Sequence, residues 1–477
     1  MPRSIAVVGA GISGLTTAFA AARRGWDVTV LEASDVAGGC LSRSPLGGHL
    51  PGGADDGAEA SLHRRPETRA LVAELGLDPV FPSRAHGSRL VTPDGLAPIP
   101  AGTLMGIPAD PGSLRGILSD EGVGRVRDEV LTPPVDGDVS CGDFLAARLG
   151  DELVDRVLDP LIGGVYAGRC RDLSLEATVP ALLPAARAGT SVRAAVADVL
   201  AERARTSGAD IPGAGGAGAA SGAPSAPPAF LSLAGGINRL VPALTTALSR
   251  RGGALRTGTR VRAVTPGGAV TTDAGTERFD DVVIALPAWA ASEVLSADAP
   301  SATGGPAADL AALLGRFDYA TSAVLTGVLR DRDAGLQGSG FLVPPAAGGL
   351  VKASTFSSNK WPWMAESLPA EHRVVRMSIG RRGDEAWTGL DDTTLADRAL
   401  AEWRSRTGYD GDLVHAEVKR WVRALPQYRP GHARLVAAID AAAARLSGVS
   451  VTGSYLDGVG IPACIGRAQD TIARLTT

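Results

Sequence analysis

The fold is decided by the stretch Ile5-Ala-Val-Val-Gly-Ala-Gly-Ile-Ser-Gly14. Its first residues are apolar and largely β-branched, which predicts a buried parallel strand. Gly9, Gly11 and Gly14 then follow the pattern G-x-G-x-x-G at the start of an Ala-rich helical segment. In this pattern the first glycine allows a tight turn, the second lets a pyrophosphate approach the backbone, and the third lets the helix pack closely on the strand. The stretch therefore predicts a phosphate-binding turn at a helix N-terminus.

A second strand is predicted over 27–32, and it ends on Glu32, eighteen residues after Gly14. An acidic side chain at this place can accept a hydrogen bond from a ribose hydroxyl. Its negative charge would also repel the additional phosphate of NADP. The strand, helix and second strand together therefore predict a dinucleotide site.

A glycine pair follows that site at Gly38 and Gly39. Such a pair favours a flavin-type over a nicotinamide-type site, because the loop has to fold back over the pyrophosphate; an ordinary Gly-rich loop is the alternative. Further along, Gly57 and Ala58 are small enough for the backbone to approach a flat ring, although a plain turn would also accommodate them.

Composition excludes several classes of protein. Charged residues make up 21% of the 477 residues and hydrophobic ones 45%, which argues against wholesale disorder and against a protein with many membrane spans. The net charge is −4 and the chain has lysine only at 352, 360 and 419, so nothing favours a nucleic-acid partner. The four cysteines show no C-x-x-C spacing, so we expect reduced thiols and no metal site. The uncharged run 4–22 is interpreted as strand and helix rather than as a membrane span.

Two further segments suggest ligand contacts. The repeated glycines of Gly164-Val-Tyr-Ala-Gly168 fit either backbone pressed against a bulky ligand or a helix–strand junction. Lys360 stands beside Trp361 and could meet a carboxylated aromatic ligand, although a solvated lysine next to core tryptophans is the favoured alternative. Near the C-terminus, Pro462 is expected at the first position of a helix running to 475, whose N-terminus can face a flavin ring.

These patterns together resemble the protoporphyrinogen/coproporphyrinogen oxidase family, and most closely its soluble, Gram-positive bacterial type, the coproporphyrinogen III oxidases. The resemblance covers nearly the whole chain outside 208–228. It is carried by Gly9–Gly14, Glu32, Gly38-Gly39, Gly164-Val-Tyr-Ala-Gly168, Ala424-Leu-Pro-Gln-Tyr428 with Gly431-His432, and Gly458-Val-Gly-Ile-Pro-Ala-Cys-Ile465. It implies an α/β fold, α+β overall, with amine-oxidase-like flavoprotein architecture: a Rossmann-type FAD-binding domain, a mixed-sheet substrate domain and a helical lid domain.

The resemblance also implies an activity. A family member of this type is an FAD enzyme of haem biosynthesis that removes six electrons and six protons from a porphyrinogen, with oxygen as acceptor and hydrogen peroxide as product. The cofactor carries the difficult step, so no catalytic side chain is expected. The expected partners are the porphyrinogen, molecular oxygen and, transiently, other haem-pathway enzymes. The expected location is the cytoplasm, with at most peripheral membrane contact.

The expected domain limits combine these patterns with the chain's composition. The FAD-binding domain is expected to be discontinuous, over 1–83, 229–290 and 446–477. The helical lid is expected over 84–207, and the substrate domain over 291–445. Residues 208–228 consist almost wholly of Gly, Ala, Ser and Pro, which predicts a flexible insertion.

Site residues are carried over from the resemblance by position. For the substrate, Arg89 matches an arginine that pairs with a propionate, and Gly164 matches a backbone position beside the tetrapyrrole; Lys360 is added from its own sequence context. For the cofactor, the matching positions are expected to contact the pyrophosphate, ribose, adenine and flavin ring: Gly9, Gly11, Ile12, Ser13, Gly14, Glu32, Gly39, Cys40, Arg43, Gly57, Ala58, Val261, Trp421, Val459, Gly460 and Ile461.

The chain departs from the family pattern after the glycine pair. Similar members commonly carry basic residues where this chain has Cys40 and Ser42, and its arginine is displaced by one position, to Arg43. Neutralisation of the pyrophosphate is therefore expected to fall to Arg43 or to be weaker. Three alternatives stay open: a protoporphyrinogen IX oxidase, another amine-oxidase-like flavoenzyme, and a flavin-binding scaffold without turnover.

Overall fold

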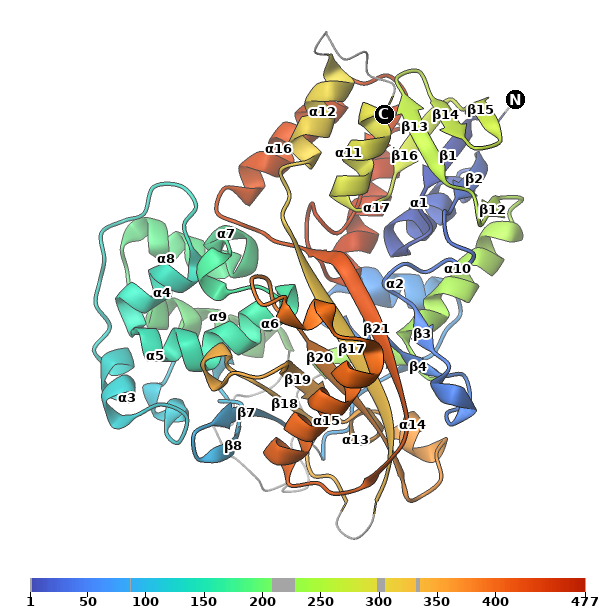
Figure 1. The fold of residues 1–477 in the computed structure, drawn as a ribbon. Helices are drawn as coiled ribbons and strands as arrows, with labels where there is room; N and C mark the ends of the chain where they lie inside the picture. Colours follow the sequence, from blue (N-terminus) through green and yellow to red (C-terminus); the bar gives the residue numbers. More distant parts are fainter. Residues whose placement is uncertain (1, 86, 208–227, 298–304, 332–334, 477) are drawn as a thin grey trace. The chain divides into compact units, whose positions relative to one another are not determined.

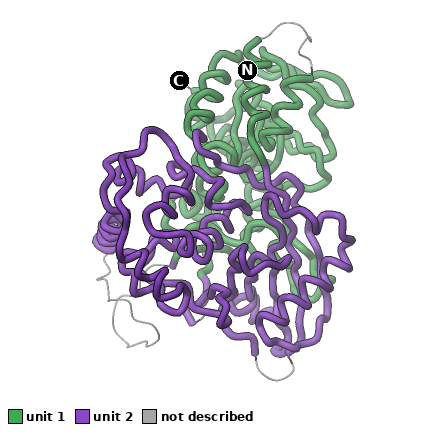
Figure 2. The backbone as a smooth tube through the Cα atoms, turned by 60° about the vertical axis from the view of Figure 1, so that its left-hand side comes forward, with its two compact units in different colours: residues 1–81, 229–318, 433–477 green, residues 82–228, 319–432 purple. Residues whose placement is uncertain are grey.

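The structure is a computed structural model, which describes residues 2–85, 87–207, 228–297, 305–331 and 335–476. The chain folds into two compact units, coloured separately in Figure 2. Unit 1 comprises Met1–Phe81, Ala229–Asp318 and Ala433–Thr477, and unit 2 comprises Pro82–Pro228 and Tyr319–His432. Residues 208–227 of the predicted insertion lie outside the described residues.

Unit 1 is built around a five-stranded parallel sheet in the order β12-β2-β1-β16-β22. Its strands come from three separate segments of the chain: β1 (Ser4–Val8), β2 (Asp27–Leu31), β12 (Ala254–Arg256), β16 (Asp281–Ile284) and β22 (Val449–Val451). The two strands predicted around the glycine turn therefore lie at the centre of the sheet. Their apolar runs are buried because helices cover them, as expected for a parallel sheet.

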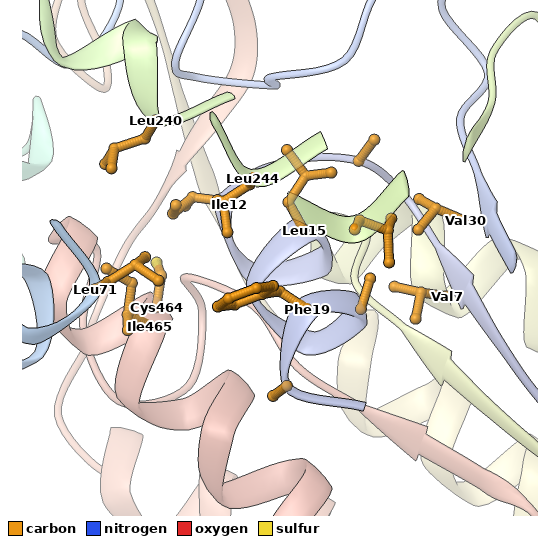
Figure 3. Close-up of a cluster of buried hydrophobic side chains, with 14 of the residues drawn as sticks. Val7, Ile12, Leu15, Phe19, Val30, Leu71, Leu240, Leu244, Cys464 and Ile465 are labelled. Carbon is orange, nitrogen blue, oxygen red and sulfur yellow. The ribbon is translucent and has the colours of Figure 1, made fainter. Parts of the chain in front are cut away.

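Three helices supply much of the core of unit 1: α1 (Ile12–Ala22), α10 (Leu240–Ser249) and α17 (Ile461–Arg474). All eleven residues of α1 are buried. Figure 3 shows Phe19 of α1 among side chains from α10 and α17, with Ile465 and Leu71 nearby. Leu71 belongs to α2 (Pro66–Glu74). The uncharged run 4–22 is thus a core strand and helix, and no helix among the described residues is long and apolar enough to cross a bilayer.

Two expectations about unit 1 need correction. The pattern of residues 255–264 predicts one strand that rejoins the parallel sheet, but the structure has two elements there. β12 joins that sheet, whereas β13 (Val261–Thr265) belongs to an antiparallel sheet with β14 (Ala269–Thr272) and β15 (Gly275–Arg278). The strand is interrupted at Gly258, whose N–H donates a hydrogen bond to the backbone oxygen of Ser34, just beyond β2. The last helix begins at Ile461, so Pro462 is its second residue.

The limits of unit 1 also differ from those expected for the substrate domain. Residues 291–297, 305–318 and 433–445 belong to unit 1 rather than to the unit that holds 319–432. In unit 1, α12 (Pro306–Leu314) packs on α11 (Ala288–Ser296). Arg445, just after α16 (His432–Ala443), bonds to Asp309 of α12 at 2.9 Å, which ties the two stretches together.

Unit 2 contains a seven-stranded mixed sheet in the order β21-β17-β20-β19-β18-β7-β8. Its strands are β7 (Ser88–Thr92), β8 (Gly95–Pro98), β17 (Tyr319–Arg330), β18 (Gly340–Leu342), β19 (Val351–Thr355), β20 (His372–Ile379) and β21 (Asp412–Pro426). Only the β7–β18 pair is parallel. The helix α15 (Asp392–Thr407) packs on one face of this sheet and buries Trp403 there (Figure 1).

The helical part of unit 2 follows β8 and runs from α3 (Asp120–Arg127) to α9 (Val192–Ser207). Residues 151–166 form one helical run, whose middle, Val154–Gly163, is a π-helix. Pro160 lies inside it and has no N–H to donate, and a wide turn accommodates this loss. The run ends at Ala167, which has a left-handed backbone with φ 49°.

Candidate functional site

The glycine turn between β1 and α1 is shaped by contacts that leave no room for a side chain at Gly9 or Gly14. Gly9 has φ +100°, and a Cβ there would lie 2.9 Å from the oxygen of Ala285. A Cβ on Gly14 would lie 1.9 Å from the oxygen of Gly9. A Cβ on Gly11, in contrast, would meet nothing within 4 Å. The open space therefore lies over Gly11, beside the start of α1, where the first N–H groups of a helix lack intrahelical acceptors.

Glu32, at the carboxyl end of β2, is held in place by two backbone donors. Its carboxylate accepts hydrogen bonds from the N–H of Ala10 and the N–H of Ser34, each at 2.8 Å. Ala10 lies inside the glycine turn, so the carboxylate sits at the edge of that turn. A carboxylate oxygen can accept more than one hydrogen bond, so Glu32 can also accept one from a ribose hydroxyl.

The glycine pair folds back onto the turn, as the sequence predicts. Gly38 donates its N–H to the oxygen of Ala10 at 2.9 Å and forms a bridge with Gly11. Gly39 has φ +55°, and a Cβ there would lie 3.2 Å from the Cα of Gly11. The next residue, Cys40, accepts a hydrogen bond on its backbone oxygen from the N–H of Ala58 at 3.0 Å.

The first turn of the C-terminal helix α17 packs beside the start of α1. Its N-cap is Gly460, and Ile461 is buried in the core beside α1. Burial raises the pKa of the Cys464 thiol to about 12, with a smaller contribution from Cys40 in the same direction, while the thiol also hydrogen-bonds to Ser13. The first turns of α1 and α17 are therefore in contact.

A cavity of about 340 Å³ lies at the carboxyl ends of β1 and β2. Val8, Leu31 and Val261 line it together with side chains that the sequence analysis did not select: Ala33, Thr259, Arg260, Arg262, Leu286, Trp289, Ala290, Glu293, Val294 and Ala297. Trp289 lies in α11, the helix that follows β16, and this position could have been found from the sequence, because ligands of parallel sheets bind beyond the carboxyl ends of strands. The cavity can take a flat, weakly polar group such as a nucleobase.

Two predicted cofactor residues, Arg43 and Trp421, make contacts within the protein. Arg43 is exposed and donates to the oxygen of Gly52 at 3.1 Å. The neighbouring Ser42 hydroxyl bonds to the carboxylate of Asp56. Trp421 belongs to β21 of unit 2, where the ammonium of Lys419 lies 5.3 Å from its ring centroid. The remaining predicted positions, Gly57 and Val459, are half-buried in unit 1.

In unit 2, two stretches that carried the resemblance pack on each other. The side-chain amide of Gln427 donates to the oxygen of Tyr166 at 2.7 Å, and the Tyr166 ring lies 5.2 Å from that of Tyr428. Tyr428 in turn stacks on His432, with 3.8 Å between ring centroids. Gly164 itself is exposed, and a Cβ there would meet nothing within 4 Å.

The three predicted substrate residues lie toward two ends of the sheet in unit 2. Arg89 is half-buried on β7, opposite Phe341 of β18. Lys360 ends α13 (Ser357–Lys360), which follows the last residue of β19, and its ammonium lies 5.0 Å from the Trp361 ring. The loop of Gly164 is tied to the other end, because Ala167 accepts a hydrogen bond from the N–H of Arg382, just after β20.

The arrangement in unit 1 is that of a dinucleotide-binding site. Open space at Gly11 in the glycine turn and an acidic residue after the second strand fit a dinucleotide, and the folded-back glycine pair and the C-terminal helix lie beside the turn. The chain belongs to the family of flavin containing amine oxidoreductases, whose model matches residues 12–471. This confirms the fold class expected from the sequence.

Individual relatives within this family carry more specific names than the family as a whole. The coproporphyrinogen III oxidase of Mycobacterium tuberculosis is 35% identical, over 98% of this chain and 96% of that protein. The coproporphyrinogen III oxidase of Bacillus subtilis is 26% identical, over 100% of this chain and 98% of that protein. A crystal structure from Exiguobacterium sp. 255-15, which carries an inferred assignment as a protoporphyrinogen oxidase, aligns with a TM-score of 0.81 and 26% identity, over 100% of this chain and 99% of that one. The resemblance noted from the sequence is confirmed.

Proposed function

We propose that this chain is an FAD-dependent oxidase that converts coproporphyrinogen III to coproporphyrin III in haem biosynthesis. The observation that carries the proposal is the 35% identity to a coproporphyrinogen III oxidase across 98% of the chain. Identity of this extent covers both units, so it includes the cofactor side and the substrate side alike.

Two parts of the site in unit 1 support FAD as the particular flavin: the glycine turn with Glu32, and the cavity beside Val261. Gly11 and the start of α1 suit a pyrophosphate, and Glu32 suits a ribose. The cavity beside Val261 suits the adenine. When bound, FAD would supply hydride acceptance from a meso carbon of the porphyrinogen, with oxygen as final acceptor and hydrogen peroxide as product. The protein's own residues then have to orient the substrate and exclude competing reactions.

On the substrate side, we propose that Arg89 pairs with a propionate and that Gly164 offers backbone beside the tetrapyrrole. Arginine suits a carboxylate because its guanidinium can form two parallel hydrogen bonds. The open space at Gly164 is compatible with a flat ligand against the backbone. Lys360 would assist a propionate near Arg89. In this proposal the helical part of unit 2 acts as a lid, the enzyme works in the cytoplasm, and its contacts with other haem-pathway enzymes are transient.

The test uses the purified protein with its bound cofactor. We expect a flavin absorbance spectrum and, under air, porphyrin fluorescence that rises faster with coproporphyrinogen III than without enzyme, accompanied by hydrogen peroxide. Protoporphyrinogen IX is the comparison substrate, and faster turnover of it would make the chain a protoporphyrinogen oxidase. Peroxide from an amine but from neither porphyrinogen would instead identify an amine oxidase. A yellow protein inactive on every substrate would be a flavin-binding scaffold.

A further inference from the structure

Two buried cations lie at one end of the sheet in unit 2. Lys352, the second residue of β19, is 8% exposed, and Arg381, just after β20, is 7% exposed. Both are tied to the backbone of Val343, just after β18. The N–H of Val343 donates to the oxygen of Lys352 at 2.9 Å, and Arg381 Nη2 donates to the oxygen of Val343 at 2.5 Å. The two side chains therefore belong to one small region.

Lys352 has no carboxylate partner within ion-pair distance among the residues that the structure describes. Three carboxylates act on the charge of Arg381, those of Asp159, Asp384 and Glu402, and two of them are engaged in ion pairs. Asp159 pairs with Arg169 at 3.2 Å, and Glu402 of α15 pairs with Arg406 at 3.0 Å.

A buried ammonium without a counter-ion is costly, because burial removes the hydration of its charge. The pKa of Lys352 accordingly falls to about 7, first through burial and then through the positive charge of Arg381. An anion entering this region would gain two charge-assisted interactions at once. It would also restore the charged state of the lysine.

The region lies at the sheet end that holds the Gly164 loop. Arg382, next to Arg381, donates its N–H to the oxygen of Ala167 at 2.7 Å. Lys352 begins β19, whereas α13 and Lys360 follow the end of that strand. The two buried cations and Lys360 therefore mark opposite ends of the sheet.

We propose that Lys352 and Arg381 form a carboxylate-binding site that takes one propionate of the porphyrinogen, at the sheet end away from Lys360. The proposal rests on the proposed function, which supplies a ligand with a propionate on each pyrrole ring. Such a ligand needs cations at more than one edge.

The test is the affinity of the flavin-loaded protein for coproporphyrin III, measured by fluorescence titration. Lys352→Met keeps the length of the side chain and removes its charge. We expect this variant to bind coproporphyrin III about tenfold to a hundredfold more weakly, as for the loss of a charged hydrogen bond. Lys352→Arg should recover most of the affinity. Flavin content should not change, and thermal stability should hold or rise because a buried charge is gone.

The matched control is Arg187→Met, which removes the same charge from α8 (Leu183–Ala188), where Arg187 is 54% exposed. It should bind like the wild type. Equal affinity in Lys352→Met and the wild type would overturn the site while leaving the proposed function intact. If Lys352→Met lost kcat with its affinity unchanged, and Lys352→Arg failed to restore kcat, the binding site would be overturned in favour of a proton-transfer role for Lys352. No binding of coproporphyrin III by the wild type would contradict the proposed function itself.

Discussion

The side-chain amide of Gln427 donates a hydrogen bond to the backbone oxygen of Tyr166, 2.7 Å away, across 261 residues of sequence. This bond explains the glycines around it. A Cβ on Gly168 would lie 2.2 Å from Oε1 of Gln427, and one on Gly163 would lie 2.5 Å from the oxygen of Gly168. These two glycines therefore serve packing within the chain, whereas Gly164 faces open space. The sequence alone could not separate these roles.

Gly168→Ala is expected to destabilise unit 2, because the new methyl group collides with the buried Gln427 side chain. Overpacking of this kind costs about 1–3 kcal/mol. The measurement is the free energy of unfolding in denaturant. Gly164→Ala is the matched control and should leave stability nearly unchanged, since its Cβ meets nothing within 4 Å. Equal destabilisation by the two variants would contradict this packing.

Gly11→Ala is expected to fold normally but to bind flavin poorly. The backbone of Gly11 has φ −73° and ψ −179°, which alanine adopts without strain, and the added Cβ enters open space. That space is the proposed place of the pyrophosphate, so flavin content after purification should fall. Gly14→Ala should instead fail to accumulate as folded protein, because its Cβ would lie 1.9 Å from the oxygen of Gly9. Full flavin content in Gly11→Ala would contradict the proposal that the pyrophosphate lies over Gly11.

Arg89→Ala is expected to raise the KM for coproporphyrinogen III about tenfold or more, because a charge-assisted hydrogen bond is lost. Flavin content should stay the same. The control is Arg84→Ala, since Arg84 is exposed and close in sequence. Loss of flavin from Arg89→Ala, with KM unchanged, would show that Arg89 does not contact the substrate.

Lys352 is expected to give the free protein a pH-dependent stability. Its pKa is about 7 in the folded state, against an ordinary value of 10.5, so between these values the unfolded state binds more protons. Stability therefore rises with pH across this window, by up to about 1.4 kcal/mol per pH unit. Comparing unfolding free energies of the wild type and Lys352→Met from pH 7 to pH 10 isolates this contribution. A constant difference between the two proteins across that range would contradict the lowered pKa.

Local patterns predicted the elements that hold the cofactor side. The strand before Gly9, the strand ending near Glu32 and the helix beginning near Pro462 are all set by residues close in sequence. Apolar runs, a glycine turn and a helix start need no distant information.

Long-range contacts could not be predicted in the same way. The expected strand 255–264 is interrupted because Thr259 bonds to the backbone oxygen of Glu32, a contact visible only once the sheet has formed. Lys352 lies in the sequence Val-Lys-Ala-Ser-Thr, which is typical of a strand with its lysine on the solvent side. An irregular register between Val351 and Ala353 accompanies its burial instead. Asp55 accepts hydrogen bonds from Ile237 and Asn238, and no local pattern announces that pairing.

The strand order of unit 1 has a consequence for synthesis of the chain. β22 pairs with β16, and α17 packs on α1, so elements translated late complete the sheet and core begun by elements translated early. While residues 449–474 are still untranslated or inside the ribosome, β16 has an unpaired edge and α1 has an uncovered apolar face. Such surfaces favour aggregation. The nascent chain should therefore depend on chaperones until α17 emerges, and only then can the flavin site close.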